Sequence, residues 1–250
     1  MPMFRSFLLC FALLCDFALA HAETVTLVGE DDWYPYAAVK DGRLQGFAVD
    51  VIDAAYAAVG IQAQFVSAPY ARCLMMARTA QATGCFDSLN DARLGPEFLF
   101  HREPIFKAVI GIYARSDAGP QKVTVAGLKG RRVGFTHGYT YGDEVETDTQ
   151  IVREQAPTDI SNLRKLVMGR SEYSLVYTRV VDYLSVAYPA ELKDKVRQVG
   201  IVSEDKLFVS FSRSRPEAGR YAELLDKGLL AIRANGIYAG IEKKWKSPGL

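Results

Sequence analysis

Acidic and aromatic side chains gather between Glu30 and Asp50, in the stretch EDDWYPYAAVKDGRLQGFAVD. The stretch follows an alternating segment typical of a strand and leads into one typical of a helix. In sheets built from alternating strands and helices, ligands bind beyond the carboxyl ends of the strands. We therefore predict a binding loop in which Trp33, Tyr34 and Tyr36 offer flat ring faces, although any one ring alone could instead plug the rim of a core.

Residues 1–22 have the features of a secretory signal. Arg5 precedes an apolar run, and Ala20 and Ala22 form an Ala-x-Ala cleavage site. Asp16 within the run disfavours a retained membrane anchor, because a charge in the middle of a span is costly. We expect cleavage after Ala22, a mature protein that is not inserted in the membrane, and a periplasmic location.

The balance of charge bears on the partners of the mature protein. The chain has 30 basic and 29 acidic residues, and the predicted signal removes one of each, so the net charge stays at +1. Such a balance argues against nucleic acid or an anionic membrane as the main partner. The content of 49% hydrophobic and 24% charged residues is ordinary for a globular protein with a sizeable core.

Two cysteines, Cys73 and Cys85, remain after the signal takes Cys10 and Cys15 with it. An even pair in an exported protein, 12 positions apart, predicts a disulfide that closes a short loop. The loop-entropy relation values such a bridge at about 3 kcal/mol. The alternative is a pair of separately buried thiols.

Strands and helices alternate along the chain, so we predict an α/β fold class. A helix over 50–60 carries its apolar residues on one stripe, with Asp50 able to cap its start and Gly60 able to end it. The turn formers that begin at Arg115 separate two rounds of the same plan, which favours two compact units with a cleft between them. The predicted strands are 24–29, 61–68, 85–90, 109–113, 173–177 and one that starts at Leu207.

Four stretches resemble the periplasmic solute-binding proteins of the polar amino acid type, bacterial extracellular solute-binding protein family 3. They are GFAVDVIDAAYAAVG, CFDSLNDAR ahead of FLFHREPIF, GLKGRRVGFTHGYTYG and LLDKGLLAIRANGIYAGIEKKW, in the order and spacing of that family. The resemblance implies a two-lobed periplasmic binding protein-like fold of type II, with a ligand cleft between lobes joined by two crossing segments. It places lobe 1 at 23–114 plus 205–250 and lobe 2 at 115–204.

The same resemblance implies a receptor and not an enzyme. Its lobes are expected to close over a small polar or carboxylate solute, an amino acid or a derivative, and to deliver it to the membrane permease of an ABC-type importer. We expect no cofactor, no metal and no nucleic acid, and we expect the chain to work as a monomer.

In lobe 1 the resemblance assigns solute-binding roles to rings and to a polar loop. Trp33 falls where the family places a ring that stacks on the solute, and Tyr70 where a second side chain closes the other side. Ser88, Asn90 and Arg93 fall in the loop that holds the solute's carboxylate. An arginine suits this role because its planar fork makes two parallel hydrogen bonds to a carboxylate. Arg93 is out of register, however, since it arrives two residues early when counted from Ser88.

In lobe 2 the stretch GFTHGYTYG resembles the family's loop whose N–H groups and threonine hydroxyl bind the solute, and Thr140 is the matching threonine. Tyr139 and His137 flank it and are candidates for the same wall or for its rim. In lobe 1, Arg72 and Asp87 are additional candidates, with solvated or mutually paired charges as the alternative.

Tyr177 is the main departure from the family pattern. It stands where members that bind amino acids keep an aspartate for the α-ammonium group, and the acidic position of lobe 1 holds Glu30. A tyrosine supplies no negative charge at neutral pH. A small carboxylate, a modified amino acid and an aromatic solute are therefore alternatives to a standard α-amino acid.

Two rival functions fit the same fold. Some relatives act as dehydratases, cyclohexadienyl dehydratase among them, and Glu30, Asp87 or His137 could be nominated as the general acid. However, no spacing of histidine and cysteine points to zinc, and GLKGRR lacks the glycine pattern of a phosphate loop. The other rival is a ligand-binding protein that signals and does not serve transport.

Overall fold

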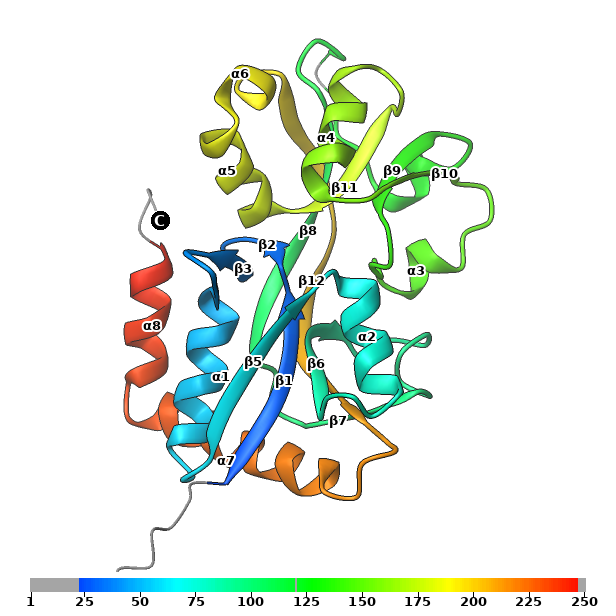
Figure 1. Cartoon of the computed structure of the whole chain (residues 1–250). Coiled ribbons are helices and arrows are strands. Elements are labelled where there is room, and N and C mark those ends of the chain that lie inside the picture. The colour runs from blue at the N-terminus through cyan, green and yellow to red at the C-terminus, as the bar shows by residue number, and fades with distance from the viewer. Residues whose placement is uncertain (1–22, 120, 247–250) are drawn as a thin grey trace, which may run out of the picture.

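The computed structural model describes residues 23–119 and 121–246 (Figure 1). The predicted signal peptide, 1–22, lies outside the described residues. Within the described ranges, none of the helices has both the length and the apolar composition needed to cross a bilayer.

A nine-stranded sheet organises the described part of the chain, and a three-stranded sheet lies beside it. The strands are β1 (Thr24–Glu30), β2 (Asp32–Trp33), β3 (Ala37–Lys40), β4 (Arg43–Gln45), β5 (Gln62–Ala68), β6 (Gly84–Leu89), β7 (Phe98–Phe100), β8 (Phe106–Arg115), β9 (Arg132–Thr136), β10 (Val152–Ala156), β11 (Tyr173–Tyr177) and β12 (Val196–Ser212). The large sheet has the order β10-β9-β11-β8-β12-β6-β1-β5, with β7 paired to β12, and the small sheet has the order β2-β3-β4.

Helices cover both parts of the large sheet (Figure 1). The helices are α1 (Phe47–Ala57), α2 (Tyr70–Arg78), the 3-10 helix η1 (Val125–Leu128), α3 (Asp143–Glu146), α4 (Asp159–Val167), α5 (Thr178–Ala187), α6 (Pro189–Leu192), α7 (Ala218–Ala234) and α8 (Ile237–Lys246). The longest of the described helices, α7, buries one apolar face, which includes Leu225 and Leu229. Gly228 on that face allows close packing on α1, since a Cβ there would lie 2.0 Å from the Ala55 carbonyl oxygen.

Strands β8 and β12 run through both halves of the molecule (Figure 1). They pair antiparallel from Phe106 opposite Leu207 to Arg115 opposite Val196. We call β1 to β7 with α1, α2, α7 and α8 lobe 1, and β9 to β11 with α3 to α6 lobe 2. The predicted α/β fold, with two lobes joined by two crossing segments, is confirmed, whereas the limits at 114/115 and 204/205 stay a prediction.

Helix α1 begins at Phe47, whereas the sequence predicted a start at Asp50. The reason lies in the binding loop, whose Pro35 carbonyl accepts a hydrogen bond of 2.9 Å from the Phe47 N–H. Gly46 precedes the helix with φ +153°, and a Cβ there would lie 2.0 Å from the Tyr36 carbonyl oxygen. The loop therefore docks onto the first turn of α1, and only glycine permits this approach.

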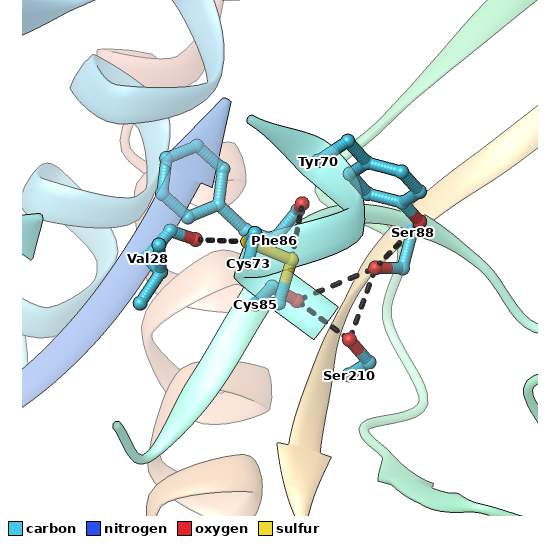
Figure 2. Close-up of a disulfide and its surroundings, with 7 residues drawn as sticks. All are labelled: Val28, Tyr70, Cys73, Cys85, Phe86, Ser88 and Ser210. Atoms are coloured by element: carbon cyan, nitrogen blue, oxygen red, sulfur yellow. Dashed lines mark hydrogen bonds between the residues drawn. A yellow bond between two sulfur atoms is a disulfide. The ribbon is translucent and has the colours of Figure 1, made fainter. Parts of the chain in front are cut away.

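The predicted disulfide between Cys73 of α2 and Cys85 of β6 is present, with the two Cα atoms 5.4 Å apart (Figure 2). The Cys85 carbonyl oxygen also accepts a hydrogen bond of 2.8 Å from the Ser210 hydroxyl of β12. Ser88 links this cluster to α2, because its Oγ accepts a hydrogen bond of 3.1 Å from the Tyr70 hydroxyl. A covalent bond and a buried hydrogen-bond network thus fix α2 against the central strands.

Candidate functional site

Residues of both lobes line one pocket between the carboxyl ends of their strands. Lobe 1 contributes the end of β1, the small sheet, the start of α2 and the end of β6, and lobe 2 contributes the loop after β9 and the end of β11. Such strand ends are where ligands bind in sheets of this type. The lining residues are Glu30, Trp33, Tyr70, Asp87, Leu89, Tyr139, Thr140 and Tyr177.

The pocket is contracted and adjoins a larger cavity. Its cavity volume is about 10 Å³, which is room for about one water molecule. The adjoining cavity has a volume of about 530 Å³ and shares Glu30 and Tyr70 with the pocket. Asp31, Asp32 and His137 also line this cavity. A solute of several heavy atoms therefore needs the pocket walls to move apart before it can enter from that side.

Two carboxyl groups lie in the pocket, one from β1 and one from β6. Glu30 is 9% exposed, and its Oε1 accepts a hydrogen bond of 2.5 Å from the Tyr139 hydroxyl of lobe 2. Asp87 is 7% exposed, and neither of its carboxyl oxygens has a hydrogen-bond partner among the described residues. The same holds for the indole Nε1 of Trp33. Buried polar atoms without partners are rare, so this cluster requires an explanation.

An irregularity in the sheet places Asp87 at the pocket. The pairing of β6 with β12 passes from Ser88 opposite Phe208 to Cys85 opposite Ser210. Strand β6 therefore advances three residues while β12 advances two, which is a β-bulge. Asp87 lies in the bulge with φ +63°, an unusual backbone conformation for a residue other than glycine. Such bulges redirect a side chain, and strained conformations of this kind cluster at functional sites.

Burial controls the ionisation of the pocket carboxyls. It raises the pKa of Asp87 and of Glu30 well above their ordinary values, because a poorly hydrated site disfavours the charged form. For Glu30, the hydrogen bond from Tyr139 lowers the pKa and the nearby carboxyls of Asp159 and Asp87 raise it further. In lobe 2, burial raises the pKa of Asp159 to about 7. The pocket therefore favours neutral carboxyl groups until a positive charge lies beside them.

Aromatic rings form most of the remaining pocket surface. The Trp33 ring meets the Tyr177 ring edge to face, with centroids 4.9 Å apart, and thereby spans the two lobes. The Tyr70 ring likewise meets the Tyr139 ring edge to face, with ring centroids 5.4 Å apart. Each pair joins one ring of lobe 1 to one of lobe 2. The rings thus form an apolar enclosure whose π-faces suit an apolar body or a cation.

Several predicted site residues do not line the pocket. Ser88 is buried beneath it, where it bonds Tyr70, and Asn90 is exposed. Arg93 is also exposed, and its guanidinium donates a hydrogen bond of 2.7 Å to the Gly138 carbonyl oxygen of lobe 2. The backbone N–H of Arg93 donates a hydrogen bond of 3.1 Å to the Asp91 carboxylate in the same loop.

The additional candidates Arg72, His137 and Asp87 differ in their exposure to solvent. Arg72 is exposed on α2, and His137 is exposed and lines the adjoining cavity. Asp87, for which a solvated position was the alternative, is buried in the pocket. Leu89 lines the pocket although no pattern in the sequence indicated it, because an apolar residue in a strand resembles a core residue. Among the described residues, no cluster of three or more His, Cys, Asp and Glu side chains could hold a metal ion.

The lobes also contact each other near α3 and near α5, which lie on opposite sides of the crossing strands (Figure 1). At α3, the Ala92 N–H donates a hydrogen bond of 3.1 Å to the Asp143 carboxylate. At α5, the Lys40 ammonium donates one of 2.6 Å to the Tyr183 hydroxyl and lies 4.9 Å from the Tyr34 ring centroid. Together with the bond from Tyr139 to Glu30, these contacts hold the walls together.

The chain matches the profile of the bacterial extracellular solute-binding proteins, family 3, over residues 25–248. Among solved structures, an ancestral arginine-binding protein bound to arginine is 18% identical with a TM-score of 0.75, covering 90% of this chain and 98% of that one. A histidine kinase sensor domain with similarity to periplasmic binding proteins is 18% identical with a TM-score of 0.77, covering 90% and 96%. The GluR0 ligand-binding core from Nostoc punctiforme, in complex with L-glutamate, is 20% identical with a TM-score of 0.73, covering 90% and 100%.

The comparison with curated proteins found no match. At these identities the structural likenesses establish the fold, which is the two-lobed type II fold of periplasmic binding proteins, and not the solute. The family profile covers almost all of the described residues. The chain belongs to the bacterial extracellular solute-binding proteins, family 3.

Proposed function

We propose that this protein is a periplasmic receptor that captures a small solute in the pocket between its lobes and delivers it to an ABC-type importer. The observation that carries the proposal is the shared pocket, in which five lining residues come from lobe 1 and three from lobe 2. A site built this way is complete only when the lobes are together. Its occupation is therefore coupled to lobe closure, and a permease can recognise the closed form.

Lobe opening is the step that admits the solute. In the contracted pocket, the Tyr139 hydroxyl of lobe 2 donates its hydrogen bond to the Glu30 carboxyl of lobe 1. The Trp33 ring of lobe 1 also contacts the Tyr177 ring of lobe 2. Both contacts join the lobes, so both break when the lobes part. A solute that supplies new contacts to the two walls then shifts the equilibrium towards closure.

The family resemblance offers Arg93 as the partner of a solute carboxylate. To act in this way its guanidinium has to leave the Gly138 carbonyl oxygen, 2.7 Å away, when the lobes open. Arg93→Ala tests this role. Loss of binding of the identified solute supports a carboxylate clamp at this position, and unchanged binding removes Arg93 from the site.

A thermal-shift screen tests the receptor function. A binding solute raises the Tm with its concentration, by the equivalent of about 2.7 kcal/mol at 100 times its Kd. Mass analysis of the recovered compound separates the functions, because a receptor returns its solute unchanged and a dehydratase consumes it. Trp33→Ala removes a ring from the pocket and is expected to abolish the shift. If amines, amino acids, small carboxylates and neutral solutes all leave the Tm unchanged, the proposal fails.

A further inference from the structure

The charge of the pocket differs from that expected for a carboxylate solute. Among its eight lining residues, Glu30 and Asp87 carry carboxyl groups and none has a basic side chain. We infer that the solute is a small organic ammonium ion without a carboxylate, held by Glu30 and Asp87 and enclosed by the pocket rings. This inference rests on the proposed receptor function. Such an ion supplies the positive charge that the lining residues lack and a donor for the unpartnered Asp87 carboxyl.

Asp87 is the strongest indication of this solute. Its carboxyl group is more than nine-tenths buried, lines the pocket and has no partner on either oxygen among residues 23–119 and 121–246. A β-bulge and a left-handed backbone hold it there, although an apolar residue would suit an empty enclosure better. An ammonium N–H satisfies an unpartnered carboxylate oxygen with a charge-assisted hydrogen bond.

Glu30 provides the second acceptor on the same wall. Both carboxyls line the same pocket, and their strands are neighbours in the sheet, because β1 pairs with β6 with Val28 opposite Cys85. At present the donor to Glu30 is the Tyr139 hydroxyl, 2.5 Å away. When the lobes part, this hydroxyl withdraws with lobe 2, and an ammonium group can take its place. Two carboxylates then share one cation, which removes the mutual repulsion that disfavours ionising both.

The rings complete a site for a cation. Trp33, Tyr70, Tyr139 and Tyr177 line the pocket around the carboxyl groups. Ring faces attract alkylammonium groups through their quadrupoles, and aromatic enclosures are a general solution for binding such ions. The methylene or ring body of the amine also gains apolar contacts there, including contacts with Leu89.

The approach to the pocket has the same sign of charge. The adjoining cavity of about 530 Å³ is lined by Glu30, Asp31 and Asp32, which are consecutive in the sequence. Clefts lined by one sign of charge concentrate ions of the opposite sign and increase their association rate. An amino acid would instead bring its own carboxylate next to these acids, and the guanidinium of the predicted carboxylate clamp, Arg93, is hydrogen-bonded to the Gly138 carbonyl oxygen.

Matched pairs of compounds test the inference, each an amine and the amino acid that has one additional carboxylate. The pairs are cadaverine and lysine, agmatine and arginine, and tyramine and tyrosine, with succinate as an anion. We expect at least one amine to raise the Tm and, by calorimetry, to bind at least about tenfold more tightly than its amino acid. If an amino acid or succinate binds as tightly as every amine, the inference is overturned and the receptor function stands. If none of these compounds, nor any in the wider screen, raises the Tm, the receptor function fails as well.

Two substitutions locate the cation on the structure. Asp87→Asn and Glu30→Gln keep the side-chain shape and remove the charge, and each is expected to weaken amine binding at least about tenfold. Asp41→Asn is the matched control, because Asp41 is exposed and also has a positive φ, +50°. The Tm without solute and the far-ultraviolet circular dichroism report whether each variant folds. If both pocket variants bind the amine within about twofold of the unsubstituted protein, the carboxylates are not its partners.

Discussion

The two walls of the pocket differ in charge and in how they are held. The lobe 1 wall carries both carboxyl groups, Glu30 and Asp87, and the disulfide and buried hydroxyls beneath it fix α2 against β6. The lobe 2 wall contributes only uncharged groups, those of Tyr139, Thr140 and Tyr177, and its lobe contains no cysteine. In the proposed receptor, the two lobes therefore have different roles. Lobe 1 selects the solute by its charge, and lobe 2 encloses the bound solute.

Removing the disulfide is expected to have the largest effect on this comparison. In Cys73→Ala/Cys85→Ala, the free energy of unfolding should fall by about 3 kcal/mol, because the unfolded chain loses a cross-link. For a chain of this size this corresponds to a Tm lower by roughly 6–12 °C, measurable by calorimetry. Solute affinity should fall too, since Tyr70 and Asp87 sit on the elements that the bridge joins. A variant with unchanged Tm and affinity would show that the lobe 1 wall is fixed without the bridge.

The pH dependence of stability should report the buried acids. A carboxyl whose pKa is raised on folding keeps its proton at pH values where the unfolded chain has lost it, so the folded protein binds more protons. The free energy of unfolding therefore falls as pH rises above about 4, by about 1.4 kcal/mol per pH unit for each such group until its folded pKa is reached. For Asp159 this limit is about 7. Asp87 and Glu30 add to the same slope.

Urea unfolding at about pH 5 and about pH 7 measures this slope. Asp87→Asn should make this slope shallower, by at most about 1.4 kcal/mol per pH unit, because one proton is removed from the difference between folded and unfolded chains. The exposed Asp41→Asn should leave it unchanged. Parallel pH profiles for Asp87→Asn and the unsubstituted protein would mean that Asp87 ionises normally, and the conclusion that burial keeps its carboxyl neutral would then be wrong.

Tyr139→Phe sharpens the contrast between the walls. It removes the lobe 2 hydroxyl that donates to Glu30, so the free energy of unfolding should fall by about 1 kcal/mol in urea titrations. Amine affinity should be maintained or increased, because the hydroxyl competes with the ammonium for Glu30. Tyr188→Phe, at an exposed position, is the control. A parallel loss of stability and amine affinity would place the Tyr139 hydroxyl among the groups that hold the solute.

The smallest expected effect concerns the contact between the lobes near α5. Lys40→Met removes the hydrogen bond to Tyr183 and the cation over Tyr34, both remote from the pocket acids. Partly exposed contacts of this kind contribute about 0.5 kcal/mol, so affinity measured by calorimetry should fall roughly two- to threefold. The Tm without solute should barely change. Lys107→Met, an exposed position on β8, is the control, and equal affinities for both variants would show that this contact does not support closure.

Much of the fold follows from patterns that are local in the sequence. Alternation and turn formers predicted β1, β5, β6, β8, β11 and part of β12 in their order, and the cysteine count predicted the disulfide. The short strands β2, β3, β4 and β7 were not predicted. The start of α1 was missed because it depends on the Tyr36 backbone meeting Gly46. Strand β12 was expected from Leu207 and begins at Val196, since its polar first half is a strand only through its pairing with β8.

For the pocket, too, local sequence patterns predicted some residues and missed those that depend on distant parts of the chain. Trp33 was predicted because its loop follows a strand, and strand ends meet at one edge of a sheet, whereas Tyr139 was a candidate only through the family resemblance. The burial of Asp87 could not be predicted, because the bulge that turns it inward arises between two strands far apart in the sequence. The direction of Arg93 depends on a carbonyl of the other lobe, which no spacing within its own loop encodes.

The paired crossing strands have a consequence for solute size. Because β8 and β12 are neighbours in one ladder, sliding one lobe past the other would break its hydrogen bonds, whereas bending or twisting the ribbon preserves them. The register shifts of β12 between Gln198 and Gly200 and between Ile201 and Ser203 mark where such a ribbon bends most readily. In the proposed receptor, we therefore expect lobe motion to be a swing about this ribbon that returns the pocket walls to the same separation. A solute longer than this separation would prevent full closure of the lobes. The pairing of β8 with β12 would therefore make the receptor select solutes by length.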